Sequence, residues 1–314
     1  MDRSYQWPEG QSPLQELSDP LFGDKGIKVV IKRDDLLRPF GGNKGRKLKY
    51  AFEGFVRSGS KGMITLGGPF SNHIHAFSTL CAHFDNAGIA LVRGEVDDLS
   101  NPVLSYARGC NVTLISLTRK EYAARYTDEF VAHIKAKYPD HYLIPEGGAS
   151  EPGLKGCVEL GQEIAEGDGV APNFVFVSAG TGATASGVAS ALPRHTKVMA
   201  ISALRERIIT NAFNRSISMV GLNEHAEIAL NTDYHFGGFA RWDKRLINFI
   251  NGFERRLGIM LDPVYTGKTF FALFDMAENG LIPEGSQVTV IHTGGMPGRA
   301  GFNYRFPGLL EDPF

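Results

Sequence analysis

The sequence has few cysteines, no long apolar run and no excess of one charge. Its three cysteines, Cys81, Cys110 and Cys157, are widely spaced and outside any metal-ligand pattern, so we expect buried reduced thiols and no bound metal. No apolar run could span a bilayer, and the first residues lack the apolar core of a secretory signal. We therefore expect a cytoplasmic protein.

The charges nearly cancel, with 33 basic and 34 acidic residues and a net charge of -1. No basic stripe with interleaved aromatic residues stands out, which disfavours nucleic acid and anionic membranes as partners. A chain of 314 residues with 43% hydrophobic residues can build a large core, and it is long enough for two lobes.

Apolar runs alternate with helical patterns along the chain, and many of the 37 glycines fall where an apolar run ends. This alternation predicts an α/β fold with two open, mostly parallel twisted sheets that carry helices on both faces. We expect an irregular arm over 1–25, one long helix over 119–138, and a glycine and threonine turn over 180–187 with a helix after it. Ligands of such sheets bind at the carboxyl ends of strands, so the glycine turns there predict one shared cleft.

A lysine lies at a glycine-rich junction between a strand and a helix, in Gly41-Gly42-Asn43-Lys44-Gly45-Arg46-Lys47. Backbone amide dipoles at such a junction disfavour the ammonium form and lower the pKa of the lysine. A neutral lysine amine is a nucleophile that can form a Schiff base. By itself, the same stretch also fits a turn followed by a basic, solvated helix face.

A second glycine turn, Ser178 to Gly187, follows the most apolar strand. Small residues let backbone amides converge on an anion, and the helix behind them adds its positive N-terminal end. A phosphate is the natural guest, although a flexible surface turn is the alternative. The turn also matches a relaxed dinucleotide pattern, but the next strand ends in Ile201-Ser202-Ala203-Leu204-Arg205 without the acid that would hold a ribose.

Two further stretches carry polar groups. In Gly67-Gly68-Pro69-Phe70-Ser71-Asn72-His73, a serine and an asparagine lie at a helix start, where free amides cap the helix or bind a carboxylate. In Asp262-Pro263-Val264-Tyr265-Thr266-Gly267-Lys268, Tyr265 is either a general acid or a core aromatic with a satisfied hydroxyl. A Schiff-base lysine, a monophosphate cradle and polar helix starts together predict a pyridoxal 5'-phosphate site.

These stretches resemble the 1-aminocyclopropane-1-carboxylate deaminase and D-cysteine desulfhydrase family, within the pyridoxal-phosphate enzymes of the tryptophan synthase β-subunit fold (fold type II). The resemblance covers nearly the whole chain and is most specific in GGNKGRKL (41–48), GGPFSNH (67–73), GTGAT (180–184) and LDPVYTGK (261–268). It implies a homodimer, a smaller inserted domain at 46–158, and a larger cofactor-binding domain made of 1–45 and 159–314.

The resemblance also implies residue roles. Lys44 would bind the aldehyde of the cofactor, with Lys47 as the less favoured candidate. Ser71 would face the substrate carboxylate or assist proton transfer, Asn72 would lie beside the ring hydroxyl, and Tyr265 would be an active-site tyrosine. The phosphate would be held by Gly180, Thr181, Gly182, Ala183 and Thr184.

Three departures from the deaminases bear on the reaction. Thr266 replaces the glutamate that would face the pyridine nitrogen, Phe239 replaces a second tyrosine, and Phe70 replaces a glutamine. A hydroxyl does not keep that nitrogen protonated, so the ring is a weaker electron sink, and β-elimination is favoured over opening of the cyclopropane. Threonine at this position is what the D-cysteine desulfhydrase branch shows.

We therefore expect a lyase that converts D-cysteine to pyruvate, sulfide and ammonia. The same-fold alternative is 1-aminocyclopropane-1-carboxylate deaminase, which gives 2-oxobutanoate and ammonia. Two alternatives of other classes are a pyridoxal-phosphate-binding protein without efficient turnover and a nucleotide-dependent oxidoreductase.

Overall fold

The structure is a computed structural model that describes residues 6–8, 10–167, 169–220 and 225–311. Its strands are β1 (Leu14–Glu16), β2 (Lys28–Lys32), β3 (Gly62–Gly67), β4 (Gly88–Arg93), β5 (Val112–Leu117), β6 (His141–Ile144), β7 (Phe174–Ala179), β8 (Lys197–Ser202), β9 (Glu227–Asn231) and β10 (Gln287–Ile291). Its α-helices are α1 (Pro20–Gly23), α2 (Lys44–Ser58), α3 (Asn72–His83), α4 (Pro102–Gly109), α5 (Arg119–Ala123), α6 (Asp128–Lys137), α7 (Glu151–Glu166), α8 (Ala183–Ala189), α9 (Glu206–Ser218), α10 (Lys244–Leu257), α11 (Thr266–Glu278) and α12 (Met296–Arg305). Two short 3-10 helices are η1 (Asp34–Leu36) and η2 (Glu146–Gly148).

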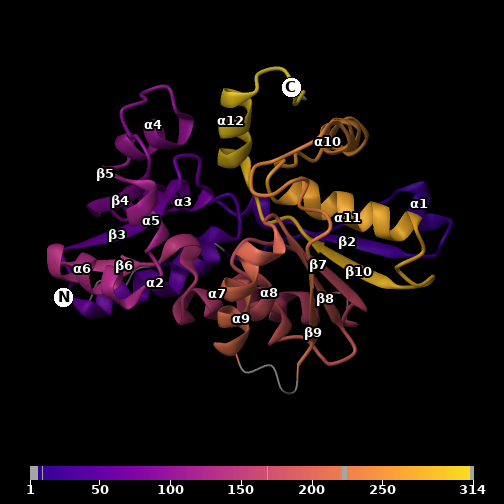
Figure 1. The fold of residues 1–314 in the computed structure, drawn as a ribbon. Helices are drawn as coiled ribbons and strands as arrows, with labels where there is room; N and C mark the ends of the chain where they lie inside the picture. The colour runs from indigo at the N-terminus through magenta and orange to yellow at the C-terminus, as the bar shows by residue number, and fades with distance from the viewer. Residues whose placement is uncertain (1–5, 9, 168, 221–224, 312–314) are drawn as a thin grey trace.

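The strands form two sheets, which confirms the predicted fold class. A four-stranded sheet has the order β5-β4-β3-β6 and is parallel throughout. A six-stranded sheet has the order β1-β2-β10-β7-β8-β9, and only β1 runs antiparallel to its neighbour. We call the four-stranded sheet with its helices the small lobe, and the six-stranded sheet with its helices the large lobe (Figure 1).

Helices cover both faces of each sheet. In the large lobe, one core lies under α10, α11 and α12 and another under α7, α8 and α9. In the small lobe, one core lies under α2, α3 and α4, while α5 and α6 close the other. Parallel strands buried on both faces read as continuous apolar runs, as β7 does with Phe174-Val175-Phe176-Val177.

Three expected elements differ in the structure. The helix expected over 119–138 is two helices, because Thr127 caps a new start at α6 by accepting the backbone N–H of Phe130. The turn expected over 180–187 ends early, because α8 already begins at Ala183. The expected irregular arm contains β1 and α1, while residues 1–5 and 9 of that arm lie outside the described residues.

The two lobes meet along α2, α7 and α12. Helices α2 and α7 pack against each other, and α7 also packs on α8 of the large lobe. The domain boundaries predicted at 46 and 158 fall inside α2 and α7, and they stay a prediction. Figure 1 shows α12 rising between the lobes close to α4, so the last helix contacts the small lobe.

Candidate active site

The lysine turn lies against the carboxyl end of β10. The backbone N–H of Asn43 donates to the carbonyl of Thr293 at 3.2 Å. A Cβ atom at Gly42 would stand 2.5 Å from that carbonyl oxygen, and one at Gly294 would stand 2.2 Å from the carbonyl oxygen of Gly41. Both positions therefore require glycine, and the close approach brings the start of α2 to the edge where β2 and β10 end.

Asn43 links the lysine to the glycine turn after β7. Lys44 is the first residue of α2, and its Nζ donates to Oδ1 of Asn43 at 3.2 Å. The Nδ2 of Asn43 donates to Oγ1 of Thr184 at 3.1 Å. The structure thus brings the predicted aldehyde-binding lysine and the predicted phosphate turn together. Asn43 was not predicted as a site residue, although it precedes the lysine in the motif.

The electrostatics around Lys44 favour a neutral amine. Burial lowers the pKa of Lys44 to about 7, helped by the nearby positive charge of Lys47 and opposed by Cys157 and Asp262. Lys47 is 3% exposed, and burial lowers its pKa as well. Two ammonium ions close to each other in a poorly solvated place repel, so the surroundings favour the neutral, nucleophilic form of Lys44.

The turn after β7 has the form of an anion cradle. Gly182 adopts φ +84° at the start of α8, where a Cβ atom would lie 2.5 Å from the Phe213 ring. The hydroxyl of Ser216 donates to the carbonyl of Thr181 at 2.9 Å and fixes the turn from α9. Backbone amides at the first turn of α8 are left without helical partners, and the dipole adds positive potential. The residues present therefore fit the phosphate of pyridoxal phosphate.

Ser71 and Asn72 lie at the start of α3, on the small-lobe side of the site. The Oγ of Ser71 accepts the backbone N–H groups of His73 at 3.1 Å and Ile74 at 3.4 Å. Since this oxygen accepts twice, its own proton is left to donate to a carboxylate. The Oδ1 of Asn72 accepts the N–H of Gly298 at 2.8 Å, which ties α3 to the first turn of α12.

Tyr265 and Thr266 lie on a turn organised by Asp262. The carboxylate of Asp262 accepts the backbone N–H groups of Val264, Tyr265 and Thr266. The hydroxyl of Thr266 donates to Oδ2 of Asp262 at 2.8 Å and accepts the N–H of Asp262 at 2.8 Å, and Thr266 is fully buried. Asp262 was not predicted, although an aspartate two to four residues before these N–H groups is a recognisable turn signal.

The Tyr265 ring packs against the phosphate turn. A Cβ atom at Gly180 would lie 3.3 Å from this ring, so the two are in contact. Burial, followed by the charges of Asp262 and Glu146, raises the pKa of Tyr265 well above its ordinary value. The hydroxyl therefore keeps its proton at neutral pH.

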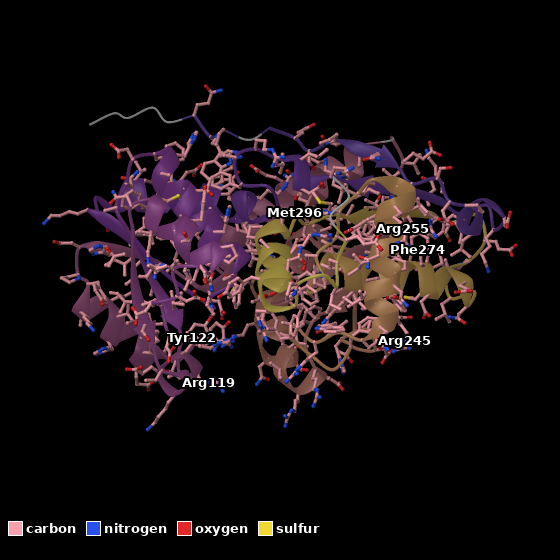
Figure 2. The ribbon with its side chains drawn as sticks, turned by 90° about the horizontal axis from the view of Figure 1, so that it is seen from above. Arg119, Tyr122, Arg245, Arg255, Phe274 and Met296 are labelled. Carbon is pink, nitrogen blue, oxygen red and sulfur yellow. The ribbon has the colours of Figure 1, made fainter. Side chains whose placement is uncertain are left out.

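A cluster on the small lobe faces this turn and was not predicted from the sequence. Glu146 accepts hydrogen bonds from the Tyr122 and Tyr126 hydroxyls and from Arg125, and Arg215 of α9 lies over the Tyr126 ring. A Cβ atom at the neighbouring Gly147 would lie 3.9 Å from the Thr181 side chain. Figure 2 labels Tyr122 on the small lobe, with Met296 at the start of α12 between the lobes. Tyr122 and Glu146 lie 24 positions apart in the sequence, and no regular spacing predicts a contact between them.

The two aromatic departures, Phe70 and Phe239, have different surroundings. The Phe70 ring packs on α12, where a Cβ atom at Gly301 would lie 2.5 Å from it and Tyr304 lies 6.0 Å away. Phe239 is 47% exposed, and its ring meets Tyr265 edge-on at 6.1 Å. Phe239 is therefore the departure that contacts a predicted site residue, whereas Phe70 joins the two lobes.

Comparisons with known proteins agree with this geometry. The family described as "Pyridoxal-phosphate dependent enzyme" matches residues 7–294. A Pyrococcus horikoshii protein named "Putative 1-aminocyclopropane-1-carboxylate deaminase" is 29% identical over 309 residues, covering 96% of this chain and 94% of that protein. A Pyrococcus furiosus protein of the same name is 30% identical, with 92% of this chain and 90% of that protein covered.

Solved structures give the same picture. A crystal structure described as an "ACC deaminase homologue" superposes with a TM-score of 0.81 at 28% identity, covering 97% of this chain and 95% of that one. A hydrogen sulfide-producing enzyme from Fusobacterium nucleatum has a TM-score of 0.67 at 15% identity, covering 91% and 95%, and shares the fold. The family match spans most of the chain, and the lysine and phosphate turn fit the cofactor. The chain therefore belongs to the pyridoxal-phosphate dependent enzymes, and pyridoxal 5'-phosphate is its cofactor.

Proposed function

We propose that the protein is a lyase that removes a leaving group from Cβ of a small amino acid, with D-cysteine as the substrate. D-cysteine and water would give pyruvate, hydrogen sulfide and ammonia, so that the C–S and C–N bonds break and no oxidant is needed. The observation that carries the proposal is the hydroxyl of Thr266, which donates its proton to Asp262 and has none to share with a ring nitrogen.

Bound pyridoxal phosphate would withdraw electrons from Cα and so make the α-proton acidic. How strongly it does so depends on the group beside its ring nitrogen. A neutral hydroxyl at Thr266 supplies no negative charge there, so the nitrogen is not held protonated. A weak electron sink suits a substrate whose leaving group departs promptly, such as a thiol, better than a strained carbon ring.

The chain's own groups divide the proton transfers. Lys44, whose pKa burial lowers to about 7, would take the α-proton as a base. Ser71 would donate its hydroxyl to the substrate carboxylate, because its oxygen already accepts two backbone N–H groups. Tyr265, which stays protonated, would serve as the acid beside the leaving group. These roles, like those of Asn72 and the Gly180–Thr184 turn, are proposals.

The second candidate is 1-aminocyclopropane-1-carboxylate deaminase. The names of the Pyrococcus relatives favour it, since they match this chain over nearly its whole length. A third candidate is a pyridoxal-phosphate-binding protein without efficient turnover, favoured by the apolar Phe239 beside Tyr265. A homodimer and a cytoplasmic location also stay predictions, and light scattering on the purified holoprotein tests the first of them.

The test is a steady-state assay of the purified holoprotein against D-cysteine, L-cysteine and 1-aminocyclopropane-1-carboxylate. Pyruvate and sulfide in equal amounts from D-cysteine, without 2-oxobutanoate from the cyclopropane, is the expected result. Lys44→Ala should lower kcat by about 10² or more, the range of a lost general base, while Lys244→Ala at an exposed position of α10 leaves it unchanged. Formation of 2-oxobutanoate would establish the deaminase instead, and no product from any substrate would favour the binding protein.

A further inference from the structure

The loop over 235–240, between β9 and α10, holds an unusual backbone conformation next to the site. Phe236 and Ala240 have φ angles of 51° and 52°, and Gly237 and Gly238 have φ angles of 93° and 123°. Non-glycine residues adopt the left-handed region at a cost, so such a loop persists only when its surroundings fix it.

Two basic side chains from different parts of the chain hold this loop through its backbone carbonyls. The Nζ of Lys268, on α11, donates to the carbonyls of His235 and Gly238, both at 2.9 Å. Lys268 is 1% exposed, so this buried amine has the loop carbonyls as its hydrogen-bond partners. The Nε of Arg205, just before α9, donates to the carbonyl of Gly237 at 3.0 Å.

The pinned loop presents one ring to the site. Phe239 follows Gly238 directly and stands edge-on to Tyr265, at a ring distance of 6.1 Å and an angle of 67°. Tyr265 in turn contacts the phosphate turn at Gly180. Lys268 lies three residues after Tyr265, so one helix start carries both the tyrosine and the anchor of the loop that packs on it. With 47% of its surface exposed, the Phe239 ring can contact a bound molecule.

We propose that Lys268 and Arg205 are positioning residues that hold Phe239 as an apolar wall of the substrate site. This wall would favour small amino acids whose β-substituent is apolar or soft, such as a methyl or thiol group, over those with a hydroxyl. An aromatic edge offers no hydrogen bond to replace the one that a substrate hydroxyl loses when it leaves water. The inference rests on the proposed function in one respect, which is that the site binds a small amino acid.

The anchoring is tested by hydrogen–deuterium exchange of the holoprotein over 235–241. In the wild type, the N–H groups of Gly237, Gly238 and Arg241 are hydrogen-bonded within the loop, to His235 or to the Gly238 carbonyl. Lys268→Met and Arg205→Met should each speed exchange there by about tenfold or more, since the loop opens locally. Lys244→Met, an exposed lysine on α10, is the matched control and should change nothing. Arg205 is exposed, so Arg205→Met should fold. The anchoring would be overturned if exchange stayed unchanged in Arg205→Met and also in Lys268→Met, provided that the second variant folds.

The selectivity is tested by titrating the holoprotein with 2-aminobutanoate and with serine while the absorption spectrum of the cofactor is recorded. The two amino acids differ only in the group on Cβ, which is a methyl in the first and a hydroxyl in the second. Both enantiomers of each are used. The wild type should bind 2-aminobutanoate about tenfold more tightly than serine, within the range expected for such a pair. Phe239→Tyr should reduce this ratio at least threefold, as should a variant whose loop has loosened. A wild-type ratio of one, or an unaltered ratio in Phe239→Tyr, would contradict the wall. If no amino acid perturbs the spectrum, the proposed function fails, while the exchange experiment still decides the anchoring.

Discussion

At the scale of single residues, the two lysines at the start of α2 have different exposures. Lys44 is partly exposed at the first helical position, whereas Lys47 is buried one turn later with 3% exposure. Each lysine comes two residues after a glycine in the motif, and charge alone does not show which of them binds the aldehyde. Lys44 is the one that hydrogen-bonds Asn43 and through it the phosphate turn.

The lowered pKa of Lys44 predicts a distinctive pH dependence in the cofactor-free protein. Pulse labelling with acetic anhydride, mapped by mass spectrometry, should show Lys44 reacting with a midpoint at about 7. Ordinary lysines, with a pKa of about 10.4, should still gain reactivity far above that pH. Lys47→Met should move the Lys44 midpoint upward, because it removes a positive charge that lowers the pKa. A Lys44 midpoint shared with the other lysines would contradict this account.

A second prediction at this scale concerns Thr266. Thr266→Val keeps the shape but leaves the buried N–H of Asp262 without its partner, and it leaves Oδ2 of Asp262 with only the backbone N–H of Thr266. We expect the free energy of unfolding to fall by about 1–3 kcal/mol. Thr266→Ser retains the hydroxyl and should lower the free energy of unfolding by less. If urea unfolding gave equal losses for the two variants, the hydrogen bonds of this hydroxyl would not be the source of the stability.

At the scale of elements, the sequence predicts best where a side chain caps its own helix. Ser71 accepts backbone N–H groups in the first turn of α3, and this helix begins where the sequence indicates. The break between α5 and α6 was missed because Thr127 lies within an unbroken apolar pattern. No helix was expected over 296–305, and α12 matters because Asn72 and Phe70 both contact it.

The same limit applies to the site. The lysine, the phosphate turn and the polar helix starts are local in sequence, so their residue types and spacing predicted them. Glu146 acts through partners brought in by the fold, and Lys268 does so through carbonyls on another loop. Such tertiary contacts leave no periodicity in the sequence.

Replacing glycine by alanine should have opposite effects on stability at two helical positions, because only one of them lies where α2 packs on α7. A Cβ atom at Gly156 would lie 1.9 Å from the Arg46 carbonyl oxygen, so Gly156→Ala must push the helices apart and should destabilise the protein by about 1–3 kcal/mol. Gly252 lies within α10 with nothing within 4 Å of its Cβ position, so Gly252→Ala should stabilise by about 0.5–1 kcal/mol. Chemical denaturation of both variants checks the pair, and equal effects would refute the close helix contact.

At the scale of the whole molecule, a buried ionic network joins segments far apart in the chain. Arg46 of α2 pairs with Asp34 at 2.9 Å and with Glu163 of α7 at 2.7 Å, and Lys32 of β2 also reaches Glu163 at 2.7 Å. Asp34 is fully buried, and Arg46 is 4% exposed. This network fixes the base of α2, and hence the place of Lys44 two residues earlier.

Removing one partner of this network should be costly. Arg46→Met leaves the buried carboxylate of Asp34 without its ion-pair partner and Glu163 with Lys32 alone, and it should lower the free energy of unfolding by about 3–5 kcal/mol. Lys61→Met, which breaks the exposed pair with Asp140, should have no measurable effect. Similar losses in the two variants would show that the network does not hold the lobes.

The network also has a pH signature. Burial alone would raise the pKa of Glu163, but Arg46 and Lys32 bring it below its ordinary value of 4.5. A carboxylate with a lowered pKa in the folded state stabilises the protein above about pH 4.5, and that stability is lost as the pH falls through the lowered value. Thermal unfolding between pH 3 and 7 should show this loss in the wild type and less of it in Arg46→Met.

The central claim is that Lys44 carries the cofactor, and borohydride reduction tests it most directly. The purified protein, reconstituted with pyridoxal phosphate, is reduced, digested and mapped by mass spectrometry. We predict that a near-visible absorption band disappears on reduction and that the pyridoxyl group lies on Lys44. An adduct on Lys47 or another lysine, or the absence of any band after reconstitution, would contradict the account.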